Sequence, residues 1–470
     1  MKEDHTISNK AKSVKVISLF DCIAHTEPIA EATVGGVMKF GTGEAGLIWQ
    51  VSEQSVTVLL LARNSKVVVG TSAKLAGNSL YVRADNNILG HSVDPLLQTI
   101  DGKKVEPSGT PLPVFGAAPT FHERAIVNEQ LETGVLMVDT LFPIVKGQRI
   151  AIIGDNKTGK TTFMSQVAAH QKNQDCVIVY VAIAKRRYDV ARLQQRLADA
   201  GVIDKTILVI ADAFDSLPAA FIAPYVGCAL AESFWRQGKD TVVFYDDLSA
   251  HAKMYRELSL LLKQPPGRDG YPGDMFYMHS SLLERAGKLR RNGATQTVLA
   301  AGTNPTGDIT GYLSTSLISM TDGQIVFDAE TMARNIRPAI DVNLSVSRVG
   351  GRSQSQQFQK LSRAVIARLA NYREARDFAR FGSDQSETVK SEIARGEKLY
   401  ELFTQLPSEQ YSAKEQFIML DALMQSDKPE DVSIAWLKSI IHDVAGEEIK
   451  PEQYVKIAAE LLKSKPAVKQ

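Results

Sequence analysis

The chain has 470 residues, of which 44% are hydrophobic and 23% charged, ordinary values for a globular protein of two to four domains. Its 54 basic and 53 acidic side chains nearly cancel, which excludes a whole-chain electrostatic attraction to nucleic acid or to anionic membranes. The first ten residues, MKEDHTISNK, lack an apolar core and predict neither a signal peptide nor a transit peptide. We find no apolar run approaching the roughly 18–20 residues that cross a bilayer, so we expect no direct membrane insertion.

The hydrophobic pattern divides the chain into three parts after a short N-terminal arm of residues 1–12. Residues 13–84 contain short β-rich runs such as VKVISLF and SVTVLLLA between glycine and polar turns, which predicts a small β-barrel. Residues 85–355 alternate apolar strand-length runs with helical patterns, typical of a mainly parallel sheet covered on both faces. Residues 356–470 predict a helical domain, whose first helix carries one apolar stripe: Phe358, Leu361, Val365, Leu369 and Tyr372.

A phosphate-binding loop is predicted where the strand-like run RIAIIG meets the next helical segment. The spacing Gly154-x-x-x-x-Gly159-Lys160-Thr161 lets backbone N–H groups curl around an anion at a helix N-terminus. Lys160 is expected to reach the β- and γ-phosphates, and the Thr161 hydroxyl to bind Mg²⁺. A chance match would lack this strand-loop-helix context. The expected nucleotide contacts are Gly154, Asp155, Asn156, Lys157, Thr158, Gly159, Lys160, Thr161 and Thr162.

A second acidic element ends the apolar run TVVFYDD. A carboxylate at the carboxyl end of a neighbouring strand is where water bound to Mg²⁺ needs a partner. Acidic residues also cap strand ends without any metal, and that alternative stays open for this motif alone. Together with the phosphate-binding loop, the motif predicts that Asp246, rather than Asp247, belongs to the Mg²⁺ shell.

Several longer stretches resemble the head subunits of rotary F-type ATP synthases over most of the chain. They include LETGVLMVDTLFPIVKGQR, ISMTDGQIVF, IRPAIDVNLSVSRVGG and FARFGSD. The order of YDDLS, PPGRDGYPGD and SVSRVGG, with the loop GDNKTGKT, is similar to the alpha class of these subunits. The resemblance implies an N-terminal β-barrel, a central RecA-like P-loop NTPase domain and a C-terminal helical bundle. This fold agrees with the three parts inferred from the hydrophobic pattern.

The resemblance also implies that the chain's own site binds ATP or ADP with Mg²⁺ without hydrolysing it. The catalytic beta class carries a glutamate after the strand that follows the phosphate-loop helix, and the alpha class usually carries glutamine. In this chain, YVAIAKRRYDVA places Lys185 at that position. A protonated lysine cannot act as a general base. It can clamp phosphate or an acidic neighbour, or lie at the surface of a strand end, and these alternatives stay open.

Further site residues follow from the resemblance. Arg348, in SVSRVGG, matches the alpha-class arginine that reaches the neighbouring beta site and stabilises charge on the γ-phosphate. Arg337 and Pro338 match the segment near adenine, and Gln405 matches a glutamine that frames the base. Here Pro407 replaces the usual second glutamine, and the Asn156-Lys157 pair departs from the usual Arg-Gln pair in the phosphate-binding loop. These departures concern base recognition and nucleotide affinity, whereas Gly154, Gly159, Lys160 and Thr161 match the phosphate-loop pattern.

The implied complex is an H⁺-transporting two-sector ATPase that makes ATP from ADP and phosphate with a proton or sodium gradient. Its implied partners are beta subunits alternating with this chain, the gamma central stalk, and the delta and b peripheral-stalk subunits. It would lie at the cytoplasmic face of a bacterial membrane, with an organelle origin left open.

Two other functions stay open. A self-sufficient homohexameric secretion-type ATPase should carry glutamate at position 185. A Rho-like RNA helicase should have an aromatic, basic barrel, whereas this barrel segment has few aromatic residues and no basic run.

Overall fold

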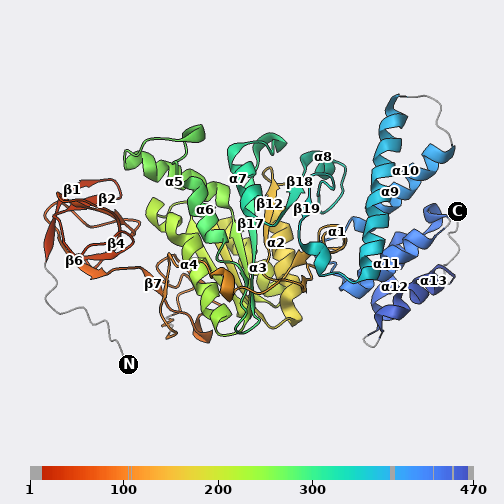
Figure 1. The fold of residues 1–470 in the computed structure, drawn as a ribbon, viewed down its shortest axis with the longest axis horizontal. Coiled ribbons are helices and arrows are strands. Elements are labelled where there is room, and N and C mark those ends of the chain that lie inside the picture. Colours follow the sequence, from red (N-terminus) through yellow and green to blue (C-terminus); the bar gives the residue numbers. More distant parts are fainter. Residues whose placement is uncertain are drawn as a thin grey trace.

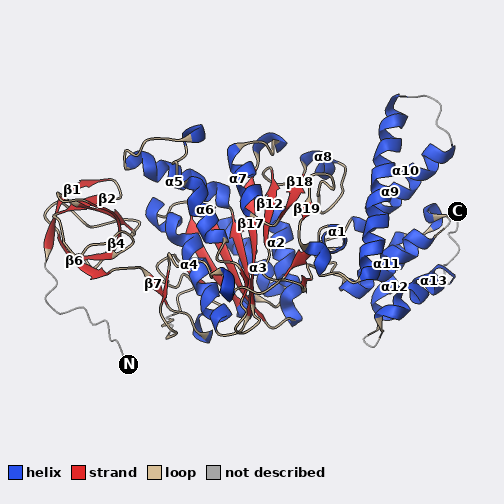
Figure 2. Ribbon diagram, in the orientation of Figure 1, coloured by secondary structure: helices blue, strands red, loops and turns tan. Residues whose placement is uncertain are grey.

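The computed structural model describes residues 13–103, 105–106, 108–381, 387–426, 428–446 and 449–463. A β-barrel lies at one end of the long axis, a sheet flanked by helices in the middle and a group of helices at the other end (Figure 1). The distribution of strands and helices confirms the predicted fold class (Figure 2). The expected N-terminal arm, residues 1–12, lies outside the described residues.

The barrel is closed by antiparallel strands in the order β1-β2-β5-β4-β3-β6. In β1, Val14 and Val16 are buried in the barrel core while Lys15 between them is exposed, as the two-residue period of a strand requires. Because the barrel closes on itself, it leaves no free strand edge. The strands are β1 Val14–Phe20, β2 Ile23–Thr26, β3 Val37–Phe40, β4 Ala45–Val51, β5 Val56–Leu60 and β6 Ser72–Gly77.

The central sheet has the order β19-β18-β12-β17-β15-β13-β14-β8, with β16 paired to β17. Its pairs are parallel except β16 with β17 and β18 with β19. Two small two-stranded sheets, β7-β9 and β10-β11, lie outside it. The strands are β7 Tyr81–Val82, β8 Ser92–Val93, β9 Leu112–Pro113, β10 Gln130–Leu131, β11 Ile144–Val145, β12 Arg149–Gly154, β13 Cys176–Lys185, β14 Thr206–Asp212, β15 Asp240–Asp246, β16 Gly287–Lys288, β17 Thr295–Thr303, β18 Gly323–Phe327 and β19 Val346–Ser347.

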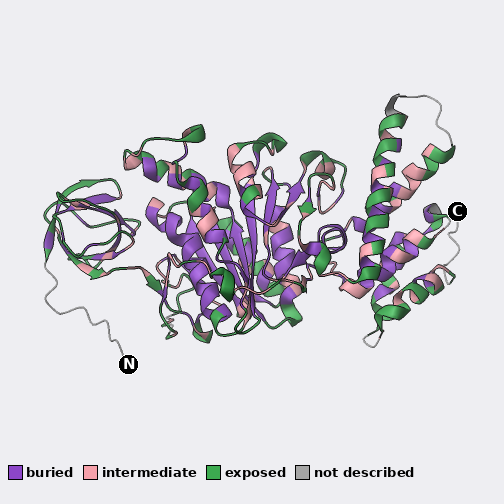
Figure 3. Cartoon of the chain, viewed as in Figure 1, coloured by how far each residue is buried: buried purple, intermediate pink, exposed green. Residues whose placement is uncertain are grey.

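Helices cover both faces of this sheet, so that its strands are buried almost throughout (Figure 3). Consecutive strand residues alternate between two apolar cores: Ile152 packs with Phe163 of α2, and Ile153 packs in the core that contains Phe221 of α4. The helices are α1 Leu136–Leu141, α2 Lys160–His170, α3 Arg187–Asp199, α4 Leu217–Arg236, α5 Leu248–Leu261, α6 Met275–Leu283, α7 Tyr312–Met320 and α8 Ala329–Ala333.

Helix α4 is a long apolar segment that the count of apolar runs in the sequence did not detect. Among the described residues it is the one helix whose length and composition would allow it to cross a membrane, although 94% of its apolar window is buried in the protein. Proline, glycine and glutamate interrupt its apolar letters, so counting uninterrupted runs missed it. Its apolar surface is used in packing against β13 and β15.

The C-terminal part is helical, as predicted. The apolar stripe from Phe358 to Tyr372 on α9 is buried at all five predicted positions, with exposed fractions of 7% or less. The same apolar core continues into α1 and α2, and this continuity holds the C-terminal helices against the phosphate-loop side of the sheet. The helices are α9 Gln356–Phe381, α10 Glu387–Phe403, α11 Ala413–Gln425, α12 Ile434–Val444 and α13 Tyr454–Lys463.

Candidate functional site

The phosphate-binding loop joins β12, which ends at Gly154, to α2, which begins at Lys160. Gly159 precedes α2 with a φ of 109°, in the left-handed region that favours glycine. A Cβ atom at Gly154 would lie 2.6 Å from the carbonyl oxygen of Phe327, so a larger residue would push β18 away. The two glycines of the motif are therefore required by backbone geometry at the carboxyl edge of the sheet.

The Lys160 side chain folds back over this loop and is buried, with 8% of the residue exposed. Its Nζ donates to the carbonyl oxygens of Gly154 at 2.7 Å and Asp155 at 2.8 Å. Burial lowers the pKa of Lys160, although the nearby carboxylates of Asp247 and Asp246 act in the opposite direction. The loop thus positions one ammonium group beside the N-terminus of α2, where an anion is favoured.

Asp246 is the carboxylate that meets the loop. Its Oδ2 accepts hydrogen bonds from the Thr161 hydroxyl and from the Tyr180 hydroxyl, each at 2.9 Å. The neighbouring Asp247 instead caps α5 by accepting from the Ala250 N–H at 2.6 Å. The structure therefore brings Thr161 together with Asp246 and not with Asp247, which agrees with the sequence prediction. Their role in holding a metal ion stays a prediction.

The sequence did not predict that Tyr180 belongs to this site. It lies in β13, and the parallel register places Ala182 of β13 opposite Asp246 of β15. Burial raises the pKa of Tyr180, and the charge of Asp246 raises it further, so the phenol remains a hydrogen-bond donor to this carboxylate. The available signal was a tyrosine in a neighbouring apolar run, but strand order and register were needed to place its hydroxyl.

Lys185 reaches Asp246 because of an irregularity at the end of β13. Regular alternation would put Lys185 on the same face as Ile183, away from α2. However, Ile183 and Lys185 pair with consecutive residues of β14, and Ala184 between them has a φ of 53°. Ala184 packs on the Ile183 side, and the Lys185 Nζ turns to lie 2.6 Å from Asp246 Oδ1. This β-bulge re-aims the side chain, a common device beside functional sites.

The Lys185 ammonium is stabilised by its partner. Burial lowers the pKa of Lys185, but the charge of Asp246 and their hydrogen bond outweigh it and raise the pKa overall. Among the clamping and surface alternatives, the structure selects the clamp on an acidic neighbour. Within the described part of the chain, the hydrogen bonds and ion pairs of Thr161 and Asp246 include no glutamate.

The donor set fits Mg²⁺ in its chemistry. A threonine hydroxyl and a carboxylate, both oxygen donors, lie 2.9 Å apart beside the loop that would hold phosphates. Thr161 and Asp246 are the residues that would hold the ion, directly or through water. Lys185 already engages one of the two carboxylate oxygens.

The residues predicted near the base come together, but the side-chain amide of Gln405 already forms hydrogen bonds within the protein. The Gln405 N–H donates to the carbonyl oxygen of Arg337 at 2.7 Å, which brings the Arg337-Pro338 segment to this loop. The Gln405 amide donates to the carbonyl oxygens of Gly134 and Glu409, and its Oε1 accepts from the Leu136 N–H. The residue is 3% exposed and fastens α1 to the loop after α10. A direct contact between the Gln405 amide and a base would require these hydrogen bonds to break.

A cavity of about 730 Å³ lies between α2, α3 and the loop that follows α10. Its lining combines Thr162 and Gln166 of α2 with Arg196 of α3 and with Pro407 and Gln410. Of these residues, the sequence predicted only Thr162 as a nucleotide contact. The cavity is large enough for the base and sugar of a nucleotide.

Arg348 lies beside the start of β18, at the end of the sheet opposite the phosphate-binding loop. Its N–H donates at 3.0 Å to the carbonyl oxygen of Asp322, the residue before β18, and its guanidinium donates at 2.8 Å to that of Thr321. The phosphate-binding loop meets the other end of β18, where Gly154 pairs with Phe327. Asp322 and Phe327 are five residues apart along β18, which corresponds to a distance of about 17 Å. The exposed Arg348 therefore cannot contact phosphates held by its own loop.

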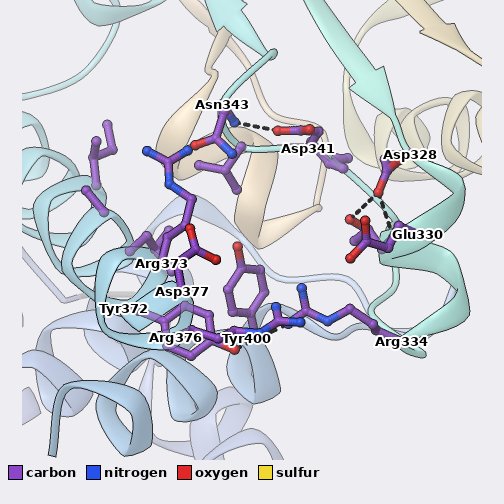
Figure 4. A pocket seen from close by; sticks show the side chains of 16 residues that line it. Asp328, Glu330, Arg334, Asp341, Asn343, Tyr372, Arg373, Arg376, Asp377 and Tyr400 are labelled. Atoms are coloured by element: carbon purple, nitrogen blue, oxygen red, sulfur yellow. Dashed lines mark hydrogen bonds between the residues drawn. The ribbon is translucent and has the colours of Figure 1, made fainter. Parts of the chain in front are cut away.

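A separate cavity of about 380 Å³ lies between the α8 region and α9 and α10 (Figure 4). Arg334 lies over the Tyr400 ring at 5.8 Å and donates to the Tyr372 hydroxyl at 3.3 Å. The lining of this cavity combines arginines with carboxylates such as Asp328 and Asp377, and contains no residue of the phosphate-binding loop. It is distinct from the site around Lys160.

Comparison with known proteins gives two family matches. Residues 134–347 match the ATP synthase alpha/beta family, nucleotide-binding domain, and residues 354–459 match the ATP synthase alpha/beta chain, C terminal domain. The chain is 39% identical over 410 residues to the ATP synthase subunit alpha of a Sulfurovum species, covering 87% of this chain and 81% of the relative. It is 40% identical over 412 residues to that of Caldanaerobacter subterraneus, with the same coverage. It is 37% identical over 452 residues to that of Desulforudis audaxviator, covering 94% and 89%.

Proposed function

The chain belongs to the ATP synthase alpha/beta family, and from this premise we propose that it is the nucleotide-holding, non-catalytic alpha-type subunit of a rotary F-type ATP synthase. The curated relatives that match most of its length carry the name ATP synthase subunit alpha, which supports the alpha assignment. The observation that carries the proposal is that Lys185, at the position where the catalytic class carries a glutamate, is an ammonium paired with Asp246.

The chain's own residues account for holding a nucleoside triphosphate. The backbone N–H groups of the loop and the N-terminus of α2 favour the phosphates, and Lys160 adds a positive charge beside them. Thr161 and Asp246 are the residues that would hold Mg²⁺, which would supply positive charge to the phosphates. The cavity beside Thr162 accommodates the sugar and base, with ATP and ADP as the expected occupants.

Position 185 carries no group that can activate water for hydrolysis. A general base must be unprotonated and within hydrogen-bond reach of the attacking water. The ion pair with Asp246 keeps the Lys185 ammonium protonated, so Lys185 cannot serve as that base. The chain therefore holds nucleotide in a regulatory site, and chemistry takes place on a partner.

Arg348 is the chain's contribution to that chemistry. Since its own loop is out of reach, an exposed arginine at the sheet edge is suited to act across a subunit boundary. A guanidinium remains charged and binds spread-out phosphate oxygens in a planar, bidentate manner. Arg348 acts as an arginine finger toward the γ-phosphate of the adjacent catalytic site.

The proposed complex contains beta subunits alternating with this chain around a gamma central stalk, with delta and b subunits in the peripheral stalk. It couples ATP synthesis to a proton or sodium gradient from the cytoplasmic face of a bacterial membrane. This chain attaches to the membrane through those partners, consistent with the burial of α4 inside its core.

Co-expression with the neighbouring subunits tests this proposal. We expect an alternating hexamer whose sites on this chain retain nucleotide through many turnovers, while the purified chain alone has no ATPase activity. Turnover by the chain alone at about 1–100 s⁻¹ would contradict the proposal and favour a self-sufficient homohexameric ATPase.

A further inference from the structure

The proposed nucleotide site carries an ammonium group, that of Lys185, beside the predicted metal-shell residue Asp246. We propose that the Lys185 ammonium takes over part of the charge neutralisation that Mg²⁺ supplies, so that this site binds ATP with little dependence on Mg²⁺. The inference rests on the proposed function, because it requires that the loop around Lys160 holds a nucleoside triphosphate.

The first argument is the occupation of Asp246. Its side chain is buried, and the hydroxyls of Thr161 and Tyr180 both donate to Oδ2, while the Lys185 ammonium pairs with Oδ1. A metal-bound water that donates to this carboxylate must compete with a charge-assisted partner at 2.6 Å. The ion pair also cancels the negative charge that would attract a divalent cation.

The second argument is the backbone that aims Lys185. The bulge at Ala184 places a non-glycine residue at a φ of 53°, which L-residues adopt at an energetic cost. In a regular strand, Lys185 would lie on the same face as Ile183, away from Asp246. The strand end is therefore shaped to bring an ammonium group to Asp246.

The third argument is the remaining hydrogen-bonding capacity of the lysine. An ammonium has three N–H donors, and within the described part of the chain we find one partner for it, Asp246. The Lys185 side chain is 27% exposed and lies on the α2 face of the sheet, as the Thr161 hydroxyl does. Its other donors are free to meet a phosphate oxygen. Lys160 and Lys185 then supply two positive charges to the phosphates.

The experiment measures ATP binding to the full chain by titration calorimetry in excess EDTA and in excess Mg²⁺. For the wild type we expect the two Kd values to differ by less than about threefold. In Lys185→Gln, loss of the charge-assisted contact should weaken metal-free binding and free Asp246, and raise that ratio by about tenfold or more. Lys185→Arg should keep the wild-type ratio. The exposed Lys253→Gln removes the same charge from α5 and should also keep it.

The outcomes separate this inference from the proposed function. Wild-type binding that needs Mg²⁺, with the ratio unchanged in Lys185→Gln, overturns the role of Lys185 and leaves nucleotide holding intact. Absence of ATP binding under both conditions overturns the proposed function and this inference together. Should Lys185→Gln not fold, as judged by circular dichroism, the wild-type ratio and Lys185→Arg decide the question alone.

Discussion

Replacing Arg348 with alanine should separate nucleotide binding from turnover. The Arg348 backbone is hydrogen-bonded to Asp322 at the start of β18, about 17 Å along that strand from the phosphate-binding loop of the same chain. At that distance, a unit charge in water contributes about 0.2 kcal/mol, and physiological salt screens it further. We therefore expect Arg348→Ala to change the Kd for ATP at this chain's own site by less than about 1.5-fold. In the assembled complex, loss of an arginine finger should slow steady-state ATP turnover by about 10³-fold or more.

The assay pairs ATP titration of the full chain with steady-state ATPase measurement of the co-expressed complex. Arg348→Lys is the matched variant, because it keeps the charge but loses the planar fork, and it should remain well below wild-type turnover. The exposed Arg352→Ala, four residues further on, controls for general loss of surface charge. Normal turnover in an assembled Arg348→Ala complex would refute the in-trans role. A loss of ATP affinity at this chain's own site in Arg348→Ala would refute the separation of Arg348 from its own phosphate-binding loop.

Three further predictions concern buried charges. Lys160→Met should weaken ATP binding about 100-fold in calorimetry, because a charge-assisted phosphate contact is lost; near-wild-type affinity would contradict its role. Arg285 and Glu232 form a 2.6 Å ion pair with exposed fractions of 1% and 2%. Arg285→Ala should lower the free energy of unfolding by about 3 kcal/mol in urea titration, while the paired replacement Arg285→Met with Glu232→Leu should recover most of it. Burial lowers the pKa of His170, but the Glu132 carboxylate, 3.8 Å from its Nε2, together with Asp139 and Gln410, outweighs that effect and raises the pKa overall. The stabilisation from this raised pKa is full below about pH 6.5 and is lost as the pH rises through the folded-state value. Urea titrations across that range should show the slope in wild type and its reduction in His170→Gln.

Much of the fold was predictable from local pattern. The spacing of Gly154, Gly159 and Lys160 specifies a phosphate-binding loop, because the contacts of the Lys160 ammonium with the loop carbonyls lie within a few residues of sequence. The helical stripe on α9 was predicted residue by residue, because a 3.6-residue period leaves one apolar face to bury. The count of uninterrupted apolar runs passed over α4, and such a count also does not say what a helix packs against; 94% of the apolar window of α4 is buried in the protein.

The sequence by itself determined that Lys185 replaces an expected glutamine or glutamate, and that Asp246 and Arg348 carry charge at motif positions. It did not determine what each group touches. Strand register and the bulge at Ala184 join Lys185 to Asp246 across 61 positions of chain. The order of β18 and β19 sets Arg348 at the edge opposite the loop. These relations depend on long-range pairing of strands, which no local pattern encodes, and they decide which site each charge serves.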